Sequence, residues 1–284
     1  MTSEPVILHA VDVLTEAEFL RFQQLIEEET GIHLSDAKMP LLVARLAKRV
    51  RQLGMISFGQ YFDRIVSGED PQERVRMFDA ISTNETRFFR EPRHFELLAN
   101  DILPRWKSQA AKGKREKRVR IWSAGCSSGE EPYSLAMTLL QSFDPAEWDL
   151  RIDATDLCTR VLDAARQGVW PMRKAADVPK ELLRRYMLRG VGSQEGLVKA
   201  GDGLRSIIRF GRMNLNEEPY PVGDYDLVFC RNVLIYFGHA QRVRVVRNLL
   251  SHLVSGGYFF IGHAETLSGI AEGPRSVIPT VYVH

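Results

Sequence analysis

Apolar residues recur with a helical period over the first third of the chain. Between residues 36 and 53 they stand three, four or seven positions apart, which places them on one stripe about 100° wide along a helix. Thr15 predicts the start of an earlier helix, because Glu18 stands three residues later as in a capping box, and Gly31 predicts its end. Asp70 followed by Pro71 predicts another helix start. We therefore expect residues 14–82 to form a helical N-terminal domain.

After residue 118 short apolar runs alternate with helical segments. The predicted strands are 119–122, 150–156, 207–213, 225–230 and 257–262, and the predicted helices are 131–143, 159–168 and 239–254. Such alternation is typical of α/β folds with a mostly parallel sheet. Glycine-punctuated, β-prone pieces at about 182–211 predict a small antiparallel β insertion. The fold class is therefore α/β, with a Rossmann-like sheet domain at 119–284, and residues 83–118 are interpreted as a linker.

The strongest candidate site is the segment 120–134, where an apolar strand leads through small residues directly into a helix start. Gly125 and Gly129 can adopt dihedral angles that other residues avoid, and they let a ligand approach the backbone closely. In doubly wound folds such a turn opens at the carboxyl end of the sheet, where ligands bind. The glycines do not follow the G-x-G-x-x-G dinucleotide pattern, and two carboxylates come after them, so a pyrophosphate would be repelled. S-adenosylmethionine, with its sulfonium and α-amino groups, fits this charge pattern better.

Polar residues also follow other predicted strands. Asp156 ends the strand 150–156, which places a carboxylate where Rossmann-type sites bind ribose hydroxyls. The buried strand 225–230 ends in Arg231 and Asn232 at the same edge of the sheet. Asn214 follows the strand between them and has two interpretations, a reader of an adenine edge or an ordinary turn residue.

Composition limits the class of protein. The chain has 284 residues, of which 44% are hydrophobic, enough for a sizeable core. No apolar run approaches the ~18 residues that span a bilayer, and the first residues lack the pattern of a secretory signal, so we expect a cytosolic protein. The three cysteines are widely spaced, which indicates neither disulfides nor a zinc site, and no metal is expected.

The formal net charge of +2 argues against general affinity for nucleic acid, but two regions are locally basic. The run 112–120 holds six cations in nine residues; it is interpreted as a solvated linker rather than a polyanion site, because no aromatic residues interleave for base stacking. On the helix 36–53, Arg45, Lys48 and Arg51 project opposite the apolar stripe, and Arg49 lies at its margin. This face either binds an acidic partner or is simply solvated.

Three long motifs carry a family resemblance. They are the segment 82–91, which includes Asn84, Thr86 and Arg90; the small-residue turn 123–134; and the segment 230–237, which ends in Tyr236 and Phe237. In this order, and over about residues 14–282, the chain resembles chemotaxis receptor methyltransferases, the CheR family. The resemblance implies an enzyme with a methyltransferase sheet domain that transfers a methyl group from S-adenosylmethionine to glutamate carboxylates of methyl-accepting chemotaxis receptors, giving glutamyl methyl esters and S-adenosylhomocysteine.

The resemblance also assigns residues. The cofactor contacts it implies are Asn84, Thr86, Arg90, Gly125, Glu131, Asp156, Asn214, Leu215, Arg231 and Asn232. Arg90, Arg231 and Tyr236 would line the methyl-transfer site as catalytic residues, whereas on the residues alone Arg90 reads as a surface ion pair and Tyr236 as a core aromatic. The basic face formed by Arg45, Lys48, Arg49 and Arg51 corresponds to the family's receptor-binding helix.

Partners and location follow from the same resemblance. The expected partner is the cytoplasmic helical region of receptors clustered at the inner face of the membrane, with no nucleic acid and no membrane insertion. Some members bind a receptor's C-terminal pentapeptide at the β insertion, and residues 189–198 are similar to those members; whether this chain does so, and whether a regulatory protein binds it, stay open. A monomer is expected, since the sequence shows no heptad seam.

A glutamate carboxylate is already ionised at pH 7 and the sulfonium is a good leaving group, so the reaction needs no general base and positioning should dominate. Two rivals are a nucleic-acid methyltransferase and a non-catalytic adaptor on the same fold. The first is disfavoured because many such enzymes carry an Asn/Asp-Pro-Pro-Tyr/Phe turn after the fourth strand, whereas this chain has Arg231 to Tyr236 at that place. The second is disfavoured by intact Glu131, Asp156, Arg231 and Tyr236, and a dehydrogenase by the missing dinucleotide glycines.

Overall fold

The computed structural model describes residues 13–271 and 273–284. The chain divides into two compact units, one up to Thr83 and one from Asn84 to His284. Each unit has its own buried apolar core. Within the described ranges, no helix is both long enough and apolar enough to cross a membrane.

The first unit consists of packed helices. Its α-helices are α1 (Glu16–Thr30), α2 (Met39–Gln52), α3 (Phe58–Ser67) and α4 (Pro71–Ile81), with a 3-10 turn at Asp36–Lys38. The predicted capping box is present, since the Glu18 N–H donates to Thr15 Oγ1 at 3.2 Å and the Thr15 N–H donates to the Glu18 carboxylate at 2.9 Å. Gly31 ends α1 with a φ of 72°, a left-handed conformation that suits glycine.

The second unit is built on a seven-stranded sheet with the order β6-β2-β1-β7-β8-β10-β9. The strands are β1 (Arg118–Ala124), β2 (Asp149–Asp156), β6 (Ile208–Arg212), β7 (Tyr225–Cys230), β8 (Leu253–Ile261), β9 (Arg275–Ile278) and β10 (Val281–Val283). The first five strands in the spatial order pair in parallel, and β10 and β9 complete the sheet antiparallel. The α/β prediction is confirmed, while the antiparallel edge was not predicted.

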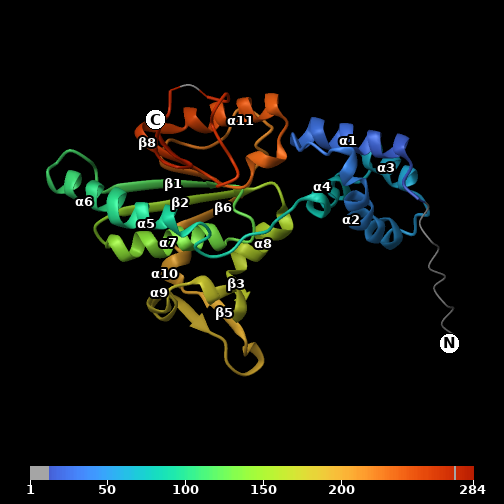
Figure 1. Ribbon diagram of the computed structural model, residues 1–284. Coiled ribbons are helices and arrows are strands. Elements are labelled where there is room, and N and C mark those ends of the chain that lie inside the picture. The colour runs from blue at the N-terminus through green and yellow to red at the C-terminus, as the bar shows by residue number, and fades with distance from the viewer. Residues whose placement is uncertain (1–12, 272) are drawn as a thin grey trace. The chain divides into compact units, whose positions relative to one another are not determined.

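Helices cover both faces of this sheet. Successive residues of a strand point to opposite faces, so Ile121 belongs to one apolar cluster and Trp122 to the other. One face is covered by α7 (Glu130–Ser142), and the other by α11 (His239–Ser251) (Figure 1). The helix α8 (Thr159–Gln167) packs against β2 and β6.

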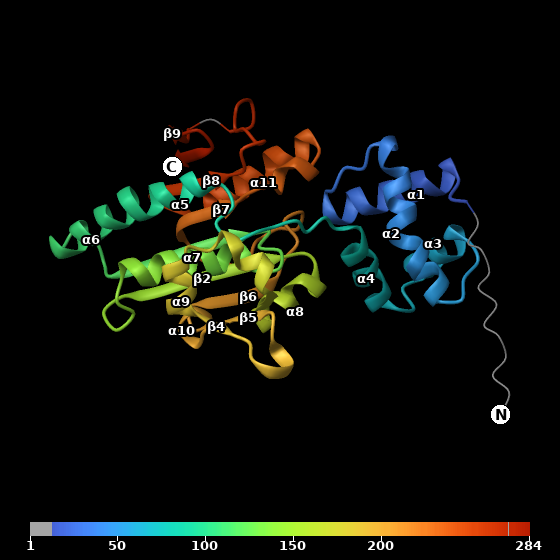
Figure 2. The ribbon, with the colours of Figure 1, turned by 60° about the horizontal axis from the view of Figure 1, so that its bottom comes forward.

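Residues 83–118 are not the linker that the sequence predicts. They contain α5 (Pro92–Leu97), a π-helical turn (Leu98–Ile102) and α6 (Leu103–Ala111), which continue one another. This helical stretch lies beside α7 (Figures 1 and 2) and buries Phe95, Leu98 and Trp106 in the core. The prediction was wrong because a linker should bury little apolar surface, whereas this segment forms part of the sheet's covering layer.

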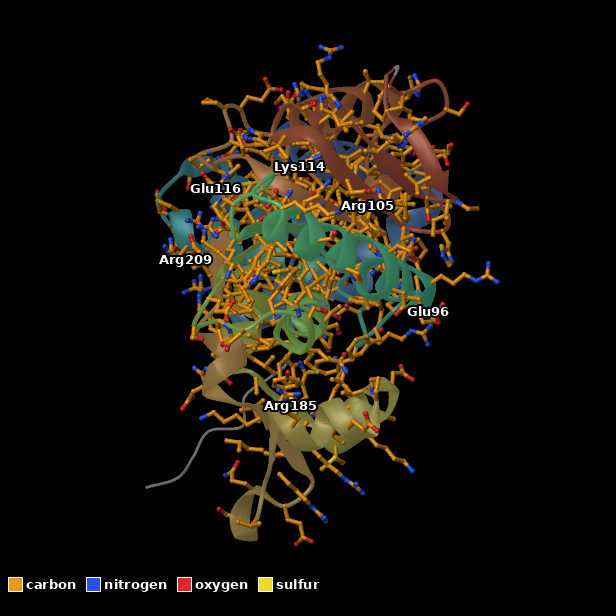
Figure 3. The ribbon with its side chains drawn as sticks, turned by 90° about the vertical axis from the view of Figure 1, so that its left-hand side faces the viewer. Glu96, Arg105, Lys114, Glu116, Arg185 and Arg209 are labelled. Atoms are coloured by element: carbon orange, nitrogen blue, oxygen red, sulfur yellow. The ribbon has the colours of Figure 1, made fainter. Side chains whose placement is uncertain are left out.

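The basic run 112–120 is largely neutralised by neighbouring acids. Arg115 forms an ion pair with Asp226 and lies over the ring of Trp106, with 4.2 Å from its Cζ to the ring centroid. Lys117 pairs with Glu147 at 2.8 Å, and further along the run an ion pair joins Arg120 to Asp149. Figure 3 labels Lys114 and Glu116 in the loop between α6 and β1. These ion pairs reduce the net positive charge of the run, and the run ends in a strand, so it is not the solvated linker that the sequence predicts.

The small antiparallel sheet begins earlier than the predicted 182–211. It consists of β3 (Val169–Pro171), β5 (Leu197–Ala200) and β4 (Met187–Arg189) in that spatial order. Two short helices belong to the same region, α9 (Lys180–Tyr186) and α10 (Asp202–Arg205), and 3-10 turns lie at Met172–Asp177 and Gly192–Gln194. The region ends before β6, which pairs with β2 in the large sheet. In Figure 1 it projects away from that sheet.

Cys126, Cys158 and Cys230 are free thiols, and all three are buried in the second unit.

Candidate active site

The large sheet has a topological switch point between β1 and β7. The chain leaves β1 for α7 on one face of the sheet, and leaves β7 for α11 on the other face. The loops after these neighbouring strands therefore diverge and open a crevice at the carboxyl edge, the usual ligand site of such sheets. Most of the predicted site residues lie in or beside these loops.

The turn after β1 depends on its glycines. Gly125 has a φ of 85° and Gly129 a φ of 95°. A Cβ added to Gly125 would lie 2.4 Å from Val233 Cγ2, so the loop after β7 packs directly against this glycine. The Gly125 and Cys126 N–H groups donate to the Thr155 carbonyl oxygen at 2.8 and 2.9 Å. The turn is thereby fixed to the end of β2.

Asp156 holds the glycine turn and the loop after β2 together. One carboxylate oxygen accepts from the Ser127 N–H at 2.8 Å, and the other accepts from the Cys158 N–H at 2.9 Å. Each carboxylate oxygen can accept more than one hydrogen bond, so this geometry is compatible with ribose hydroxyls as additional donors. The sequence placed Asp156 at this edge but did not indicate its contacts with the loops.

Asn84 lies against the same turn. Its carbonyl oxygen accepts from Ser127 Oγ at 2.9 Å, and its Nδ2 is 3.6 Å from Cys158 Sγ. Thr86, two residues later, is half-buried. The structure therefore brings the segment that begins at Asn84 to the glycine turn and Asp156.

Glu131 lies in the first turn of α7 and faces the end of β1 and the loop after β7. Its carboxylate accepts from Ser123 Oγ at 2.7 Å and lies 3.5 Å from Arg231 Nη1. Burial raises the pKa of Glu131 above its ordinary value, and the Arg231 guanidinium opposes that effect. A buried carboxylate beside an arginine is suited to an ammonium group of a ligand.

Arg231 and Asn232 follow β7 directly. The Arg231 side chain is only 1% exposed, and its Nε and Nη1 have no hydrogen-bond partner. Asn232 adopts a φ of 59°, and its buried Oδ1 also lacks a partner. Buried donors and acceptors are normally satisfied. Arg231 donors without hydrogen-bond partners, next to the Glu131 carboxylate, and an acceptor without one on the following residue fit a ligand that carries both a carboxylate and an ammonium group, as S-adenosylmethionine does.

Arg90 and Tyr236 complete the predicted catalytic set. Arg90 Nη1 donates to the Glu85 carbonyl oxygen at 3.1 Å, and the Arg90 carbonyl oxygen accepts from Arg231 Nη2. Glu91 turns away from Arg90 and pairs with Arg231 instead, so Arg90 does not form the ion pair considered from the sequence. Tyr236 is half-buried in a 3-10 turn at Leu234–Tyr236, which is not a core position.

Asn214 and Leu215 lie in the loop after β6. Asn214 Oδ1 accepts from the Asn216 N–H at 3.0 Å, and its Nδ2 donates to Glu217 at 3.0 Å. These are the local bonds of a turn residue, one of the two interpretations of Asn214. Leu215 is buried, and its carbonyl oxygen accepts from Tyr220 Oη at 2.7 Å.

Glu265 is a buried site residue that the sequence analysis missed. Its carboxylate accepts from the N–H groups of Gly262, Asn232 and Ile235 at 2.6, 2.9 and 3.2 Å. Burial raises its pKa, and these backbone bonds partly offset the rise. Glu265 thus fixes the loop that carries Arg231 and Asn232. A signal was present, since Glu265 closely follows a strand at the same sheet edge.

The basic face of α2 lies in the helical unit and is only partly exposed. Arg45 donates to the Ile81 carbonyl oxygen and to Thr83 Oγ1, and Arg49 forms a two-point ion pair with the buried Glu73. Lys48 and Arg51 are exposed. The structure therefore separates the four predicted receptor-binding cations into two anchored side chains and two that face solvent.

Comparison with known proteins matches both units. Residues 84–282 match the family model described as CheR methyltransferase, SAM binding domain, and residues 17–82 match the model of the CheR methyltransferase all-alpha domain. A Pseudomonas aeruginosa protein named chemotaxis protein methyltransferase 2 is 38% identical over 285 aligned positions, covering 99% of this chain and 98% of the relative. The Escherichia coli chemotaxis protein methyltransferase is 37% identical over 256 positions, covering 90% of this chain and 86% of the relative.

Proposed function

This chain belongs to the CheR methyltransferase family, and from that premise we propose that it esterifies glutamate side chains of chemotaxis receptors with the methyl group of S-adenosylmethionine. The class of reaction, S-adenosylmethionine-dependent methylation of chemotaxis receptors, comes with the family. The carboxylate of glutamate as the acceptor is the finer part of the proposal, and S-adenosylhomocysteine is the expected product.

The observation that carries the proposal is the set of unpaired buried groups at the switch point. Arg231 offers Nε and Nη1, and Asn232 offers Oδ1. The Glu131 carboxylate adjoins Arg231, and Asp156 ends the neighbouring strand β2. A methionine-like end would satisfy the Arg231 donors with its carboxylate and the Glu131 oxygens with its ammonium group, while Asp156 would accept from ribose hydroxyls. Asn84, Thr86, Gly125, Asn214 and Leu215 are proposed to complete the cofactor site.

When bound, the cofactor supplies an activated methyl group on a sulfonium. The protein then has to hold an acceptor carboxylate in line, exclude water and avoid neutralising the nucleophile. We assign the orientation of the carboxylate to Arg90 and Tyr236, with Arg231 as the buried cation behind them. Arg231 already faces two carboxylates and would also hold the cofactor's carboxylate, so its charge is balanced and it does not neutralise the acceptor. An acceptor carboxylate that is not neutralised keeps its nucleophilicity.

We place receptor recognition on the helical unit and the small sheet. The exposed Lys48 and Arg51 suit the acidic surface of a receptor's cytoplasmic helices, and Arg45 and Arg49 add positive charge beside them. A receptor C-terminal pentapeptide could add to the antiparallel sheet near residues 189–198, where Leu188 and Val191 are exposed. A monomeric protein located at receptor clusters on the inner face of the membrane is the expected working state.

The test is transfer of labelled methyl from S-adenosylmethionine to membranes that contain chemotaxis receptors, followed by mild base. Label on the receptor band that base releases as volatile methanol is the expected result, because esters hydrolyse under these conditions and methylamines do not. Base-stable label would contradict a carboxylate acceptor. Label on nucleic acid, or cofactor binding without any transfer to receptors, would favour the nucleic-acid or the adaptor alternative.

A further inference from the structure

A second buried acid, Glu91, contacts Arg231 and lies close to two histidines, His94 and His263. Glu91 stands at the N-terminus of α5 with a φ of 60°, and its side chain is 9% exposed. Its Oε1 accepts from the His263 N–H at 3.1 Å. Its Oε2 lies 3.3 Å from Arg231 Nη2, 3.4 Å from His94 Nδ1 and 3.9 Å from His263 Nε2. Three segments distant in sequence therefore meet at one carboxylate.

The ligand atoms of Glu91, His94 and His263 lie within 4.8 Å of one another, a spacing that a metal ion could bridge. The charges argue against a metal. Arg231 Nη2 is the nearest cationic group to the same Glu91 oxygen, so a metal ion would face a fixed positive charge in a region of low dielectric. The cluster is better described as a carboxylate already committed to a guanidinium.

His94 does not compete with Arg231 for this carboxylate. Burial, together with the Arg231 charge, lowers the pKa of His94 to about 4, so His94 is neutral at pH 7. Its Nε2 is 2.9 Å from Thr280 Oγ1, which fixes the orientation of the ring. Glu91 stays ionised, because Arg231 and the His263 N–H lower its pKa although burial alone would raise it. Arg231 is the cationic group nearest to Glu91, and the exposed His263 ring lies at the edge of the cluster, with its Nε2 3.9 Å from Glu91 Oε2.

The Arg231 guanidinium is held on several sides. Glu91 and the Arg90 carbonyl oxygen contact Nη2, Glu131 lies at Nη1, and the Phe95 and Phe229 rings lie 5.7 and 5.9 Å from Cζ. With Nη2 occupied, Nε and Nη1 remain without hydrogen-bond partners. We propose that Glu91 is a positioning residue that fixes Arg231 so that Nε and Nη1 face the cofactor's carboxylate and keep its methyl group in line with the acceptor. This inference rests on the role proposed above for Arg231.

The proposal predicts a specific kinetic defect. Without the Glu91 charge, the guanidinium has only Glu131 as an ionised partner and should move toward it, closing the donors that Arg231 presents. A displacement of about 1 Å at a reacting group can lower the rate about a hundredfold. We therefore expect Glu91→Gln to lower kcat by about tenfold or more at saturating cofactor and to raise the cofactor Kd severalfold, because the same two Arg231 donors hold the cofactor's carboxylate.

The experiment uses the full chain, receptor-containing membranes and labelled S-adenosylmethionine. Glu91→Gln is compared with Glu96→Gln, the same chemical change at an exposed position of the same helix, labelled in Figure 3. Glu91→Asp keeps the charge and should restore part of kcat. The Asp carboxylate is one methylene shorter and should hold Arg231 less well, so some loss of kcat is expected. If the Gln variant does not fold, the Asp variant alone tests the proposal, and a wild-type kcat in it overturns the positioning role. Cofactor Kd is measured by calorimetry, and melting temperature by circular dichroism.

Arg231→Lys, alone and combined with Glu91→Gln, separates the proposed role of Arg231 from the proposal that Glu91 acts through it. If Glu91 acts through Arg231, the double variant should lose no more kcat than Arg231→Lys alone. Additive losses of kcat would overturn the positioning role, and so would an unchanged kcat in Glu91→Gln. Equal losses of kcat in the Gln and Asp variants, with lowered melting temperatures in both, would also overturn it. Stoichiometric zinc that stays bound after dialysis would do the same. An unchanged kcat in Arg231→Lys would instead remove the proposed role of Arg231 itself.

Discussion

Asp156 combines a structural and a binding role in one side chain. Both of its carboxylate oxygens accept backbone N–H groups from loops that border the crevice. A ligand hydroxyl would therefore meet a carboxylate whose position is already set, so binding would cost little reorganisation.

We expect Asp156→Asn to weaken cofactor binding by about tenfold to a hundredfold, because a neutral amide accepts weaker bonds and can turn an NH₂ group toward a backbone donor. Calorimetric titration with S-adenosylmethionine measures the change. Asp163→Asn, at an exposed position of α8, is the matched control and should bind normally. An unaltered Kd in Asp156→Asn would exclude a direct role in binding.

Tyr236→Phe removes one hydroxyl from a half-buried position in the loop after β7. If that hydroxyl orients the acceptor carboxylate, turnover should fall about tenfold while cofactor affinity stays near wild type. Receptor methylation at saturating cofactor gives turnover, and titration gives affinity. Tyr282→Phe in β10 controls for the loss of a hydroxyl elsewhere. A fall in affinity with unchanged turnover would argue that Tyr236 belongs to the cofactor site only.

At the scale of elements, the turn after β1 shows how close packing can require a glycine at one position. Gly125→Ala combines a positive φ with a Cβ at 2.4 Å from Val233. Gly113 has a φ of 67° but nothing within 4 Å of an added Cβ, so Gly113→Ala carries only the backbone strain, about 1–2 kcal/mol. We expect Gly125→Ala to lose cofactor binding and Gly113→Ala to keep it. Equal binding in the two variants would show that the loop after β7 can move aside.

The helical unit contains a buried ion pair that links two helices. Glu73 in α4 is fully buried, pairs with Arg49 in α2 and accepts from Tyr61 Oη at 3.0 Å. Glu73→Gln leaves the half-buried Arg49 guanidinium without its counter-charge and weakens the bond from Tyr61, so the free energy of unfolding should fall by about 1–2 kcal/mol. Urea unfolding followed by far-ultraviolet circular dichroism checks this, with the exposed Glu69→Gln as control.

The same pair gives a pH dependence of definite sign. Burial opposes ionisation of Glu73, but the bonds from Arg49 and Tyr61 outweigh it and lower its pKa below 4.5. A carboxyl whose pKa is lowered in the folded state stabilises the protein at pH values above its ordinary pKa. This stabilisation is lost as the pH falls through the lowered pKa. The gap between wild type and Glu73→Gln should therefore be full at pH 7 and narrow below about pH 4.5. A constant gap would contradict the lowered pKa.

Elements with strong local signals could be predicted from the sequence, and others could not. The helix that starts at Pro71 begins where the sequence predicts, and the strand from Tyr225 to Cys230 has the predicted bounds. The helical stretch 92–111 was missed, since Pro104 within it argues against a continuous helix, and the π turn before it absorbs that break. The antiparallel strands β9 and β10 are short, and their pairing depends on the neighbouring β8.

The site divides in the same way. Asp156 could be placed at the sheet edge because parallel strands end together there, whereas Glu131 was assigned through the family resemblance. Glu91 and Glu265 could not be assigned, because their roles arise from contacts across long sequence separations, Glu91 with Arg231 and Glu265 with Asn232. The unpaired donors of Arg231 are likewise a property of packing and have no counterpart in the sequence pattern.

At the scale of the whole molecule, the two units divide the proposed work between receptor recognition and chemistry. Charge reversal at Lys48 and Arg51 should lower receptor methylation severalfold at low salt, with cofactor Kd unchanged, because rim charges act mainly on association. The effect should shrink as added salt screens the charges. Lys114→Glu, in an exposed loop of the other unit, is the control. Arg49 is unsuitable for this test, since its loss also breaks the pair with Glu73.

All three cysteines are buried, and all three belong to the second unit. A thiol reagent can therefore reach a sulfur only when the structure around it opens. The rate of alkylation therefore reports the opening of the second unit. If the cofactor slows alkylation and changes in the helices of the first unit do not alter its rate, the two units open independently of each other.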